Sequence, residues 1–345
     1  MQDIQTVILG LIDDLSPRQK TVLAKRFSLD GKSKKGMTLA QLGEKYGVTR
    51  ERIRQIEEAA FGAVRKKIAA GTGREVFGYL REAVDNQGSV RKEDGLMKEV
   101  EERFGTRLQP LQLRFLLEAD GSFGFYSEDK DFYDFWHRGS RALSAAKGLV
   151  DKTHRHLAQK KEEVLASKNF GAILPVLAKD FNVSDAVGLN YLAISKKFGV
   201  NKYGDFGLME WPEINPKTVR DRAYLILKDA EKPLHFRDIA DFIKERRFDG
   251  KSVHASTVHN ELIKDGRFVL VGRGIYALAE HGFTPGTARE VIQRILKESG
   301  PLHPKNLVQL VLKERLFKEN TVLLNLQNKK LFKRLSDGRY HVSQA

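Results

Sequence analysis

The sequence predicts a mainly α, multi-domain protein, built as an array of one helix-turn-helix and several winged-helix units with short β-hairpin wings. Three observations support this fold class. Residues 38–67 have the caps and the apolar spacing of two helices joined by a glycine corner. A segment that begins at residue 233 recurs about 68 positions later. Each copy is followed by a further helix and by two short apolar stretches around a glycine turn.

Composition sets the outer limits on function. The chain has 345 residues, 41% of them hydrophobic, which suits several folded domains. Its net charge of +15 is typical of a protein that meets a polyanion. The absence of cysteine excludes disulfides, thiolate metal sites and cysteine nucleophiles. No apolar run could span a bilayer, and the N-terminal residues are acidic where a secretion signal is positive. We therefore expect a cytoplasmic protein with no membrane partner.

Lysine and arginine concentrate at the two ends of the chain. Residues 1–74 contain 15 Lys and Arg against 8 Asp and Glu, and residues 284–345 contain 12 against 5. Binding to nucleic acid phosphates depends on such local positive charge. The two ends are therefore the first candidates for DNA contact.

The first helix of the helix-turn-helix has clear start and stop signals. Thr38 and Gln41 have the spacing of a capping box. Leu39 and Leu42 give this short helix a buried side, and Gly47 supplies the left-handed residue that ends it. With Val48 expected to fill the corner, the pattern predicts a helix-turn-helix unit over residues 1–72.

The second helix presents a polar face at its N-terminal end. Thr49 can cap it through the side-chain hydroxyl. Helical spacing points four residues inward: Ile53, Ile56, Ala60 and Val64. The outer face then carries Arg50, Glu51, Arg54 and Gln55. Arginine pairs with guanine, glutamine with adenine, and glutamate accepts from the cytosine amino group, so this face suits the major groove of double-stranded DNA.

Residues 15–67, from LSPRQKTVLAKRFSLDG to VTRERIRQIEEAAF, resemble region 4 of the sigma-70 family of bacterial transcription initiation factors. In that family the second helix reads the upstream (minus-35) promoter element, and the module also touches the flap of the RNA polymerase β subunit. The resemblance implies that Arg50, Glu51 and Gln55 read bases. It implies that Thr49, Arg52 and Arg54 lie at the DNA backbone.

This resemblance covers about a fifth of the chain. Few residues precede it, and no downstream stretch resembles the promoter-melting helix of a complete sigma factor. We therefore expect a sigma-like adaptor for DNA or polymerase, not a factor that initiates transcription by itself.

An internal repeat organises the C-terminal part. The segments PLHFRDIADFIKERRF (residues 233–248) and PLHPKNLVQLVLKERLF (residues 301–317) share their Pro-Leu-His start and their Lys-Glu-Arg-X-Phe end. An apolar helix is expected before each, at residues 219–227 and 288–296. A second helix is expected after each, at residues 256–264 and 321–329, followed by a β pair at residues 267–278 and 331–342. The pattern predicts winged helices over residues 217–282 and 284–345.

The first copy, residues 218–280, resembles the HARE-HTH family through PLHFRDIADFIKERRF, the preceding helix and the GRGIYAL wing. That winged helix occurs in the δ subunit of some bacterial RNA polymerases, in restriction enzymes and in chromatin proteins. The resemblance implies the fold, whereas function must be argued from the site. The chain has no acidic tail of the δ-subunit kind.

Two more winged helices are expected, over residues 75–138 and 140–215. In the first, the aromatic run at residues 123–136 would form the wing; in the second, a long basic helix is expected over residues 140–166. The aromatic residues could stack on bases, but neighbouring acids would repel phosphate, which favours core packing or protein contact. They are Phe123, Phe125, Tyr126, Phe132, Tyr133, Phe135 and Trp136.

Further DNA-contact candidates lie in the two repeated units. In the third winged unit the candidates on the groove-facing helix are Ser256, Thr257, His259 and Asn260, with Arg267 and Arg273 on the wing. In the fourth, the same helix is expected to carry Asn325, Asn328, Lys329 and Lys330, with Lys333, Arg334 and Arg339 on the wing. Solvated polar residues are the ordinary alternative at these positions.

No catalytic set is recognisable, so we expect neither enzyme activity nor a cofactor. The nine histidines lack the spacing of a metal site, and no phosphate-cradling loop or nucleophile elbow occurs. The sequence favours a sigma-like regulator that binds double-stranded DNA. The alternatives are an accessory protein docked on RNA polymerase through the β flap, and the DNA-recognition subunit of a restriction or defence system. The DNA target, the sign of regulation and the oligomeric state stay open.

Overall fold

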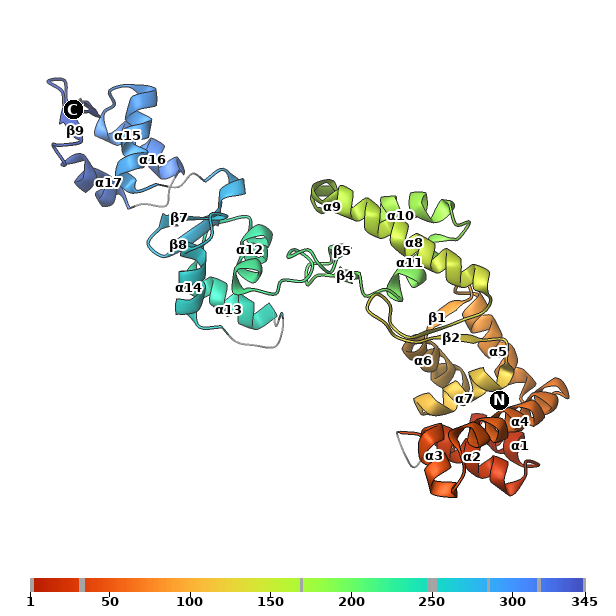
Figure 1. Ribbon diagram of the computed structural model, residues 1–345. Coiled ribbons are helices and arrows are strands. Elements are labelled where there is room, and N and C mark those ends of the chain that lie inside the picture. Colours follow the sequence, from red (N-terminus) through yellow and green to blue (C-terminus); the bar gives the residue numbers. More distant parts are fainter. Residues whose placement is uncertain are drawn as a thin grey trace. The chain divides into compact units, whose positions relative to one another are not determined.

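The structure is a computed structural model that describes residues 3–30, 35–167, 170–246, 248, 253–283, 286–314 and 318–343. Two compact units divide the chain: Met1–Gly199 with Phe206–Met209, and Val200–Asp205 with Glu210–Ala345. Helices dominate both units, and the sheets are small and antiparallel (Figure 1). The predicted mainly α class is confirmed, whereas the finer division at residues 72, 138, 215 and 282 stays a prediction.

The N-terminal helix-turn-helix consists of α1 (Ile4–Ile12), α2 (Pro17–Phe27), α3 (Leu39–Tyr46) and α4 (Arg50–Ala69). Ser16 and Gln19 form a capping box at the start of α2, where a proline at the first helical position fits the missing N–H. Val22, Leu42, Ile53 and Ile56 form a small core among α2, α3 and α4. The C-terminal half of α4 packs elsewhere, in the larger core of this unit.

A winged helix follows directly. Its elements are α5 (Arg74–Asp85), β1 (Val90–Lys92), α6 (Glu93–Phe104), α7 (Pro110–Asp120), β2 (Gly124–Tyr126) and β3 (Phe135–His137). The antiparallel sheet has the order β1-β3-β2, with Arg91 and Phe125 both opposite Trp136. Phe132, Phe135 and Trp136 are buried, so the inner part of the aromatic run is core, as its acidic neighbours indicated.

The next helices are α8 (Ser140–Gln159), α9 (Lys161–Ser167), α10 (Phe170–Lys179) and α11 (Asp185–Ala193), and β4 (Phe198–Val200) pairs with β5 (Phe206–Leu208). The prediction of one long helix over residues 140–166 is wrong. Lys160 has φ −119° and ψ 31°, outside helical geometry, and it separates α8 from α9. Leu149, Leu174 and Tyr191 form the shared core of α8, α10 and α11.

In a winged helix the third helix is the one that can enter a DNA groove. The helices α7 and α11 hold that place in their units, but both pack inside the compact unit. On α7, Phe115 is fully buried, with its ring centroid 5.7 Å from that of Phe27 and 5.9 Å from that of Phe61. On α11, the Asn190 side chain donates to the carbonyls of Gln87 and Val90 at 2.9 and 2.7 Å. These faces of α7 and α11 therefore cannot enter a DNA groove.

The second compact unit repeats one order of elements. The first copy consists of α12 (Val219–Ala230), β6 (Leu234–His235), α13 (Phe236–Arg246), α14 (Ala255–Ile263), β7 (Phe268–Gly272), β8 (Ile275–Leu278) and a 3-10 turn η1 (Ala279–His281). The second copy consists of α15 (Ala288–Ser299), α16 (Pro304–Glu314), α17 (Glu319–Leu326), β9 (Phe332–Arg334) and β10 (Tyr340–Val342). Each copy has its own apolar core. Residue 247 and residues 315–317, at the ends of the two repeated motifs, lie outside the described residues.

The two copies also share their sheet pairing. In the first, the sheet order is β6-β8-β7, and Leu234 lies opposite Tyr276. In the second, Leu302 forms an antiparallel bridge with Tyr340. Both first helices begin with a capping box, from Thr218 in one and Thr287 in the other. The repeated sequence motif thus corresponds to a repeated structural unit.

Candidate nucleic-acid interface

The corner between α3 and α4 is set by local interactions. The Thr38 amide donates to Gln41 Oε1 at 2.9 Å, and the Gln41 amide donates to Thr38 Oγ1 at 3.2 Å. Gly47 ends α3 with φ 64°, in the left-handed region where glycine meets no Cβ penalty. The Val48 amide then donates to the Gly43 carbonyl at 2.9 Å. The predicted caps and corner are all present.

Gly43 is a determinant of this corner that the sequence reading missed. A Cβ at this position would lie 2.7 Å from the Val48 carbonyl oxygen and 3.3 Å from the Arg50 amide nitrogen. Both neighbours are backbone atoms at the start of α4, so they cannot rotate away. The signal was available in the sequence, because an isolated glycine inside a predicted helix often marks a close approach.

The N-terminal half of α4 separates its buried and exposed sides as predicted. Ile53, Ala60 and Val64 are fully buried, and Ile56 is 9% exposed. The Thr49 hydroxyl accepts from the Arg52 amide at 3.1 Å and so caps the helix. The six side chains predicted to contact DNA all lie exposed on the first two turns of α4 and its cap: Thr49, Arg50, Glu51, Arg52, Arg54 and Gln55.

Several of these exposed side chains contact one another. Arg54 holds Glu51 through two hydrogen bonds, Nη2 to Oε1 at 2.8 Å and Nε to Oε2 at 2.9 Å, and also reaches Glu58 at 3.0 Å. The hydrogen bond from Arg54 lowers the pKa of Glu51, so this carboxylate is charged at neutral pH. Arg52 Nη1 donates to Gln55 Oε1 at 3.0 Å. Two of the predicted base-reading residues, Glu51 and Gln55, are therefore already paired with predicted backbone residues, Arg54 and Arg52.

Arg50 differs from its neighbours. It is exposed at the first position of α4, and among the described residues it has no ion-pair partner. Backbone N–H groups at a helix N-terminus favour negative charge, and a free guanidinium there adds a second attraction. Arg50 is therefore the side chain of this face most available to a nucleic acid.

An ion pair beneath the face holds the helices together. Arg26 on α2 donates through Nε to Glu57 on α4 at 3.2 Å, and through Nη1 to the Met37 carbonyl at 3.3 Å. Burial raises the pKa of Glu57, and the charge of Arg26 opposes that rise. The contact ties α2, α4 and the segment before α3 into one body, which fixes the direction of the exposed face.

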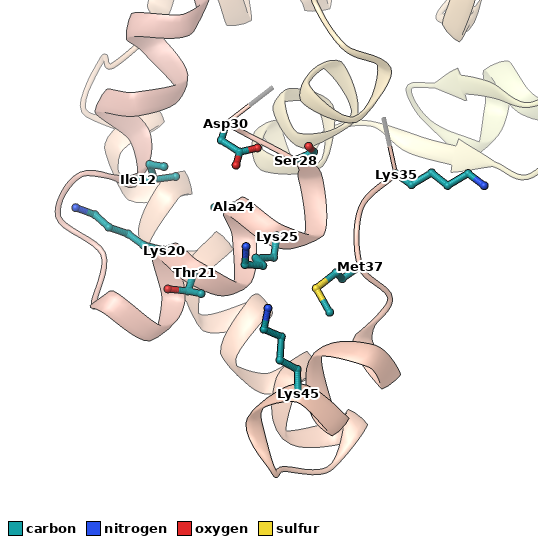
Figure 2. Close-up of a pocket in the computed structure, with 10 residues that line it drawn as sticks. All are labelled: Ile12, Lys20, Thr21, Ala24, Lys25, Ser28, Asp30, Lys35, Met37 and Lys45. Carbon is teal, nitrogen blue, oxygen red and sulfur yellow. The ribbon is translucent and has the colours of Figure 1, made fainter. Parts of the chain in front are cut away.

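A lysine-lined pocket lies beside the helix-turn-helix (Figure 2). Lys20 and Lys25 reach it from α2 and Lys45 from α3, with Thr21 and Met37 also on its walls. In Figure 2 the Lys45 side chain extends from α3 toward Lys25. Clustered ammonium groups raise the local concentration of anions. The pocket therefore adds positive potential to the module that carries the polar face.

The DNA-contact candidates of the third winged unit differ in how accessible they are. Ser256, Thr257 and Asn260 are exposed on α14. His259 is half-buried, with its ring 4.7 Å from Phe236 and 5.8 Å from Tyr276, so it packs on the core side of the helix. Arg267 forms ion pairs with Asp265 at 2.7 Å and Asp221 at 3.4 Å. Arg273 lies exposed at the β7–β8 turn.

In the fourth unit the helix is shorter than predicted. It ends at Leu326, so the prediction that Asn328, Lys329 and Lys330 lie on it is wrong; they form the turn that leads into β9. The Asn328 side chain accepts from the Lys330 amide at 3.1 Å, and this local bond favours the turn over another helical residue. Asn325 is on α17, whereas Lys333, Arg334 and Arg339 are on the β9–β10 hairpin or next to it.

Across the ranges that the structure describes, no group of three or more His, Asp or Glu side chains could hold a metal ion. Within the same ranges, no helix is both long and apolar enough to cross a lipid bilayer.

Comparison with known proteins locates a resemblance in the N-terminal module. The family model for Sigma-70, region 4 matches residues 11–66. RNA polymerase sigma factor RpoD of Helicobacter pylori is 38% identical over 81 residues, which cover 23% of this chain and 11% of that protein. SigA of Clostridium acetobutylicum is 43% identical over 58 residues, covering 17% of this chain and 15% of that one. SigA of a Nostoc species is 47% identical over 55 residues, covering 16% and 14%.

The chain therefore carries a sigma-70 region 4 helix-turn-helix at its N-terminus, as predicted. It spans no more than 15% of the length of these three relatives. The HARE-HTH resemblance of residues 218–280 lies outside the matched stretch and stays a prediction.

Proposed function

We propose that this protein is a sigma-like transcription regulator that reads promoter-type duplex DNA through α4. Arg50, Glu51 and Gln55 contact base edges in this proposal, and Thr49, Arg52 and Arg54 contact the phosphate backbone. The observation that carries it is the exposed polar face at the start of α4, on a helix-turn-helix that matches sigma-70 region 4. Phosphate contacts fix the register of the helix, and base contacts then supply sequence discrimination.

The ion pairs of the free protein suit this role. Arg54 forms an ion pair with Glu51 in the free protein. An exposed pair of this kind contributes little to stability, so Arg54 can move to a phosphate at little cost. Glu51 is then free to accept from a cytosine amino group, while Arg50 donates to a guanine. The same exchange frees Gln55 from Arg52.

A second candidate function is docking on RNA polymerase. The relatives that match the N-terminal module are named RNA polymerase sigma factors, and this observation favours a polymerase contact. In that case the β flap would be the partner, and the winged helices would serve as protein-binding modules. We propose no enzyme activity and no cofactor. We also retain the HARE-HTH assignment of residues 217–282 as a proposal, supported by the winged-helix order of elements from α12 to β8.

Selection from random-sequence duplexes tests the first function. We expect the intact chain to enrich a motif resembling a minus-35 element and the Arg50→Ala/Glu51→Ala variant to lose it, because each good base contact contributes roughly 1–3 kcal/mol of discrimination. Lys66→Ala is a matched control, since Lys66 is exposed near the far end of the same helix. An enriched motif that survives in the double variant would exclude base reading by α4.

The second function has its own readout. Binding of the purified chain to core RNA polymerase without DNA, unchanged by Arg50→Ala, would favour docking. If core polymerase is not retained while the DNA motif is enriched, the regulator acts through DNA alone.

A further inference from the structure

The two repeated winged helices can be compared residue by residue. From the third helix to the last strand, equivalent core residues lie 64 positions apart in the sequence. The matching pairs are Val258 and Val322, Leu262 and Leu326, Phe268 and Phe332, and Tyr276 and Tyr340. Because this spacing is constant, any surface position of one wing has a defined counterpart in the other.

In the third unit, acidic residues neutralise the positive charge at the base of the wing. Arg220 on α12 donates to Glu261 on α14 at 2.7 Å. Arg267, which precedes β7, is held by Asp265 at 2.7 Å and by Asp221 at 3.4 Å. The hydrogen bond from Arg267 lowers the pKa of Asp265, so the pair stays ionised at neutral pH. These cations are thus already engaged within the unit.

In the fourth unit two of these three acids are replaced, whereas Glu290 takes the place of Asp221. Asn325 occupies the position of Glu261, and Lys329 occupies the position of Asp265. The geometry is retained: Arg289 Nε on α15 donates to Asn325 Oδ1 at 3.0 Å, as Arg220 does to Glu261. The contact between α15 and α17 is kept, but the negative charge that Glu261 supplies in the third unit is absent.

The result is a concentration of unneutralised cations, which we call the C-terminal wing patch and define as Lys329, Lys330, Lys333 and Arg334. All four are exposed, and among the described residues none has an ion-pair partner. Lys333 lies opposite His341 in the hairpin, and nearby Arg339 is paired with Asp337 at 2.6 Å. Residues 325–339 contain five Lys and Arg against one acid, whereas residues 261–275 contain three against two. The two repeats therefore differ in charge, not in fold.

We propose that the C-terminal wing patch binds the phosphate backbone of duplex DNA without reading its sequence, and that the corresponding surface of the third unit does not. Duplex is favoured over single strands because the wing aromatics are not open for base stacking: Phe332 is buried and Tyr340 half-buried. Groove reading by α17 is disfavoured because Asn325 is held by Arg289 and also donates to the Thr321 carbonyl at 2.7 Å. The inference deepens the proposed DNA-binding function by adding affinity that is independent of sequence.

The test is the salt dependence of binding to a labelled duplex of random sequence, measured by fluorescence anisotropy with the full chain. Affinity falls with salt, and each lost phosphate contact reduces the steepness of log affinity against log salt by about 0.9. For Lys329→Ala/Lys330→Ala/Lys333→Ala/Arg334→Ala we expect the steepness to decrease by about 2–3. We expect the affinity to fall roughly 10–100-fold near 0.15 M salt. Lys244→Ala/Lys264→Ala, which removes two exposed lysines of the third unit, is the control and should leave both values unchanged.

A second variant restores two acids and removes only one of the four bases, Lys329. Asn325→Glu/Lys329→Asp recreates the third unit's pattern and can keep the contact with Arg289. We expect this variant to reduce the steepness of the salt dependence, while the circular dichroism spectrum stays that of the parent chain. An unchanged slope in both patch variants, or an equal fall in the control, would overturn the proposal. Its failure is separate from failure of α4 to read sequence, because a random-sequence duplex does not report motif enrichment.

Discussion

At the scale of single residues, Gly43 and Gly47 have different tasks in the same corner. Gly47 supplies a backbone conformation, with φ 64° at the end of α3. Gly43 supplies space, because the Val48 carbonyl lies where a Cβ would project. The first role could be read from the sequence, since it belongs to helix termination. The second depends on how closely two helices approach, and only coordinates give that distance.

We predict that Gly43→Ala destabilises the helix-turn-helix by about 1–3 kcal/mol, the usual cost of overpacking a close contact. Gly62→Ala is the control, because Gly62 lies inside α4 with nothing within 4 Å of its virtual Cβ. Alanine is the better helix former, so this variant should gain about 0.5–1 kcal/mol. Hydrogen exchange of peptides from residues 38–67 measures both changes. A gain in the Gly43 variant would contradict the close approach.

The polar face of α4 shows the same limit of prediction. The sequence placed Arg50, Glu51 and Gln55 on one exposed face, because helical spacing alone decides that. It did not indicate that Arg54 would hold Glu51, although residues three apart on a helix can pair. Whether such a pair forms depends on competing partners, which the folded surface supplies.

At the scale of elements, α7 has the place of a groove-entering helix and serves as a support. Its Phe115 contacts Phe27 of α2 and Phe61 of α4, so the first winged unit and the helix-turn-helix share one core. A winged helix over residues 75–138 was predicted from the sequence. The elements that cover α7 were not predicted, because an apolar face indicates that a helix is buried but does not identify the element that covers it.

We predict that Phe115→Ala weakens the helix-turn-helix as well as α7. Truncating a fully buried phenylalanine costs about 3–5 kcal/mol, and here the lost contacts belong to both modules. Hydrogen exchange should therefore accelerate in α1, α2 and α4 together with α5 and α7. Phe242→Ala is the comparison, since Phe242 is 37% exposed on α13 and should change little. Loss of protection confined to α7 would show that the modules do not share a core.

Element ends were the least predictable feature. The sequence extended one helix through Lys160 and another through Lys329, and the structure ends α8 at Gln159 and α17 at Leu326. Apolar residues continue past the end of α8, at Val164 and Leu165, whereas α17 is followed by polar residues only, from Gln327 to Lys330. Backbone geometry at Lys160 and a side-chain bond at Asn328 decide the stop, and neither has a strong signal in residue type.

At the scale of the whole molecule, positive charge gathers at the two ends of the chain, and each end has a proposed DNA contact. Two sites on one chain raise each other's effective concentration when a ligand is long enough to engage both. Between the two ends, Phe115 of α7 and Asn190 of α11 are used in internal packing.

We predict that the importance of the C-terminal wing patch grows with the length of the DNA. On a duplex of about one helical turn, which serves a single recognition helix, the four-alanine patch variant should bind the α4 motif like the parent chain. On a duplex several times longer, the variant should bind at least about 10-fold more weakly, because the second contact is then intramolecular. Equal losses on both duplexes, measured at the same salt, would contradict two-site binding by one chain.

The sequence by itself determined the helix-turn-helix, its caps, its exposed reading face, the repeated winged-helix unit and the gathering of charge at the ends. These features depend on interactions between residues close in the chain, or on composition. The tertiary structure decided which faces remain available. It buried Phe115 and Asn190 in contacts with distant segments, paired Arg267 with two acids, and left Lys329 and its neighbours unpaired. The physical reason is that burial and ion pairing depend on groups brought together by folding, which local patterns do not specify.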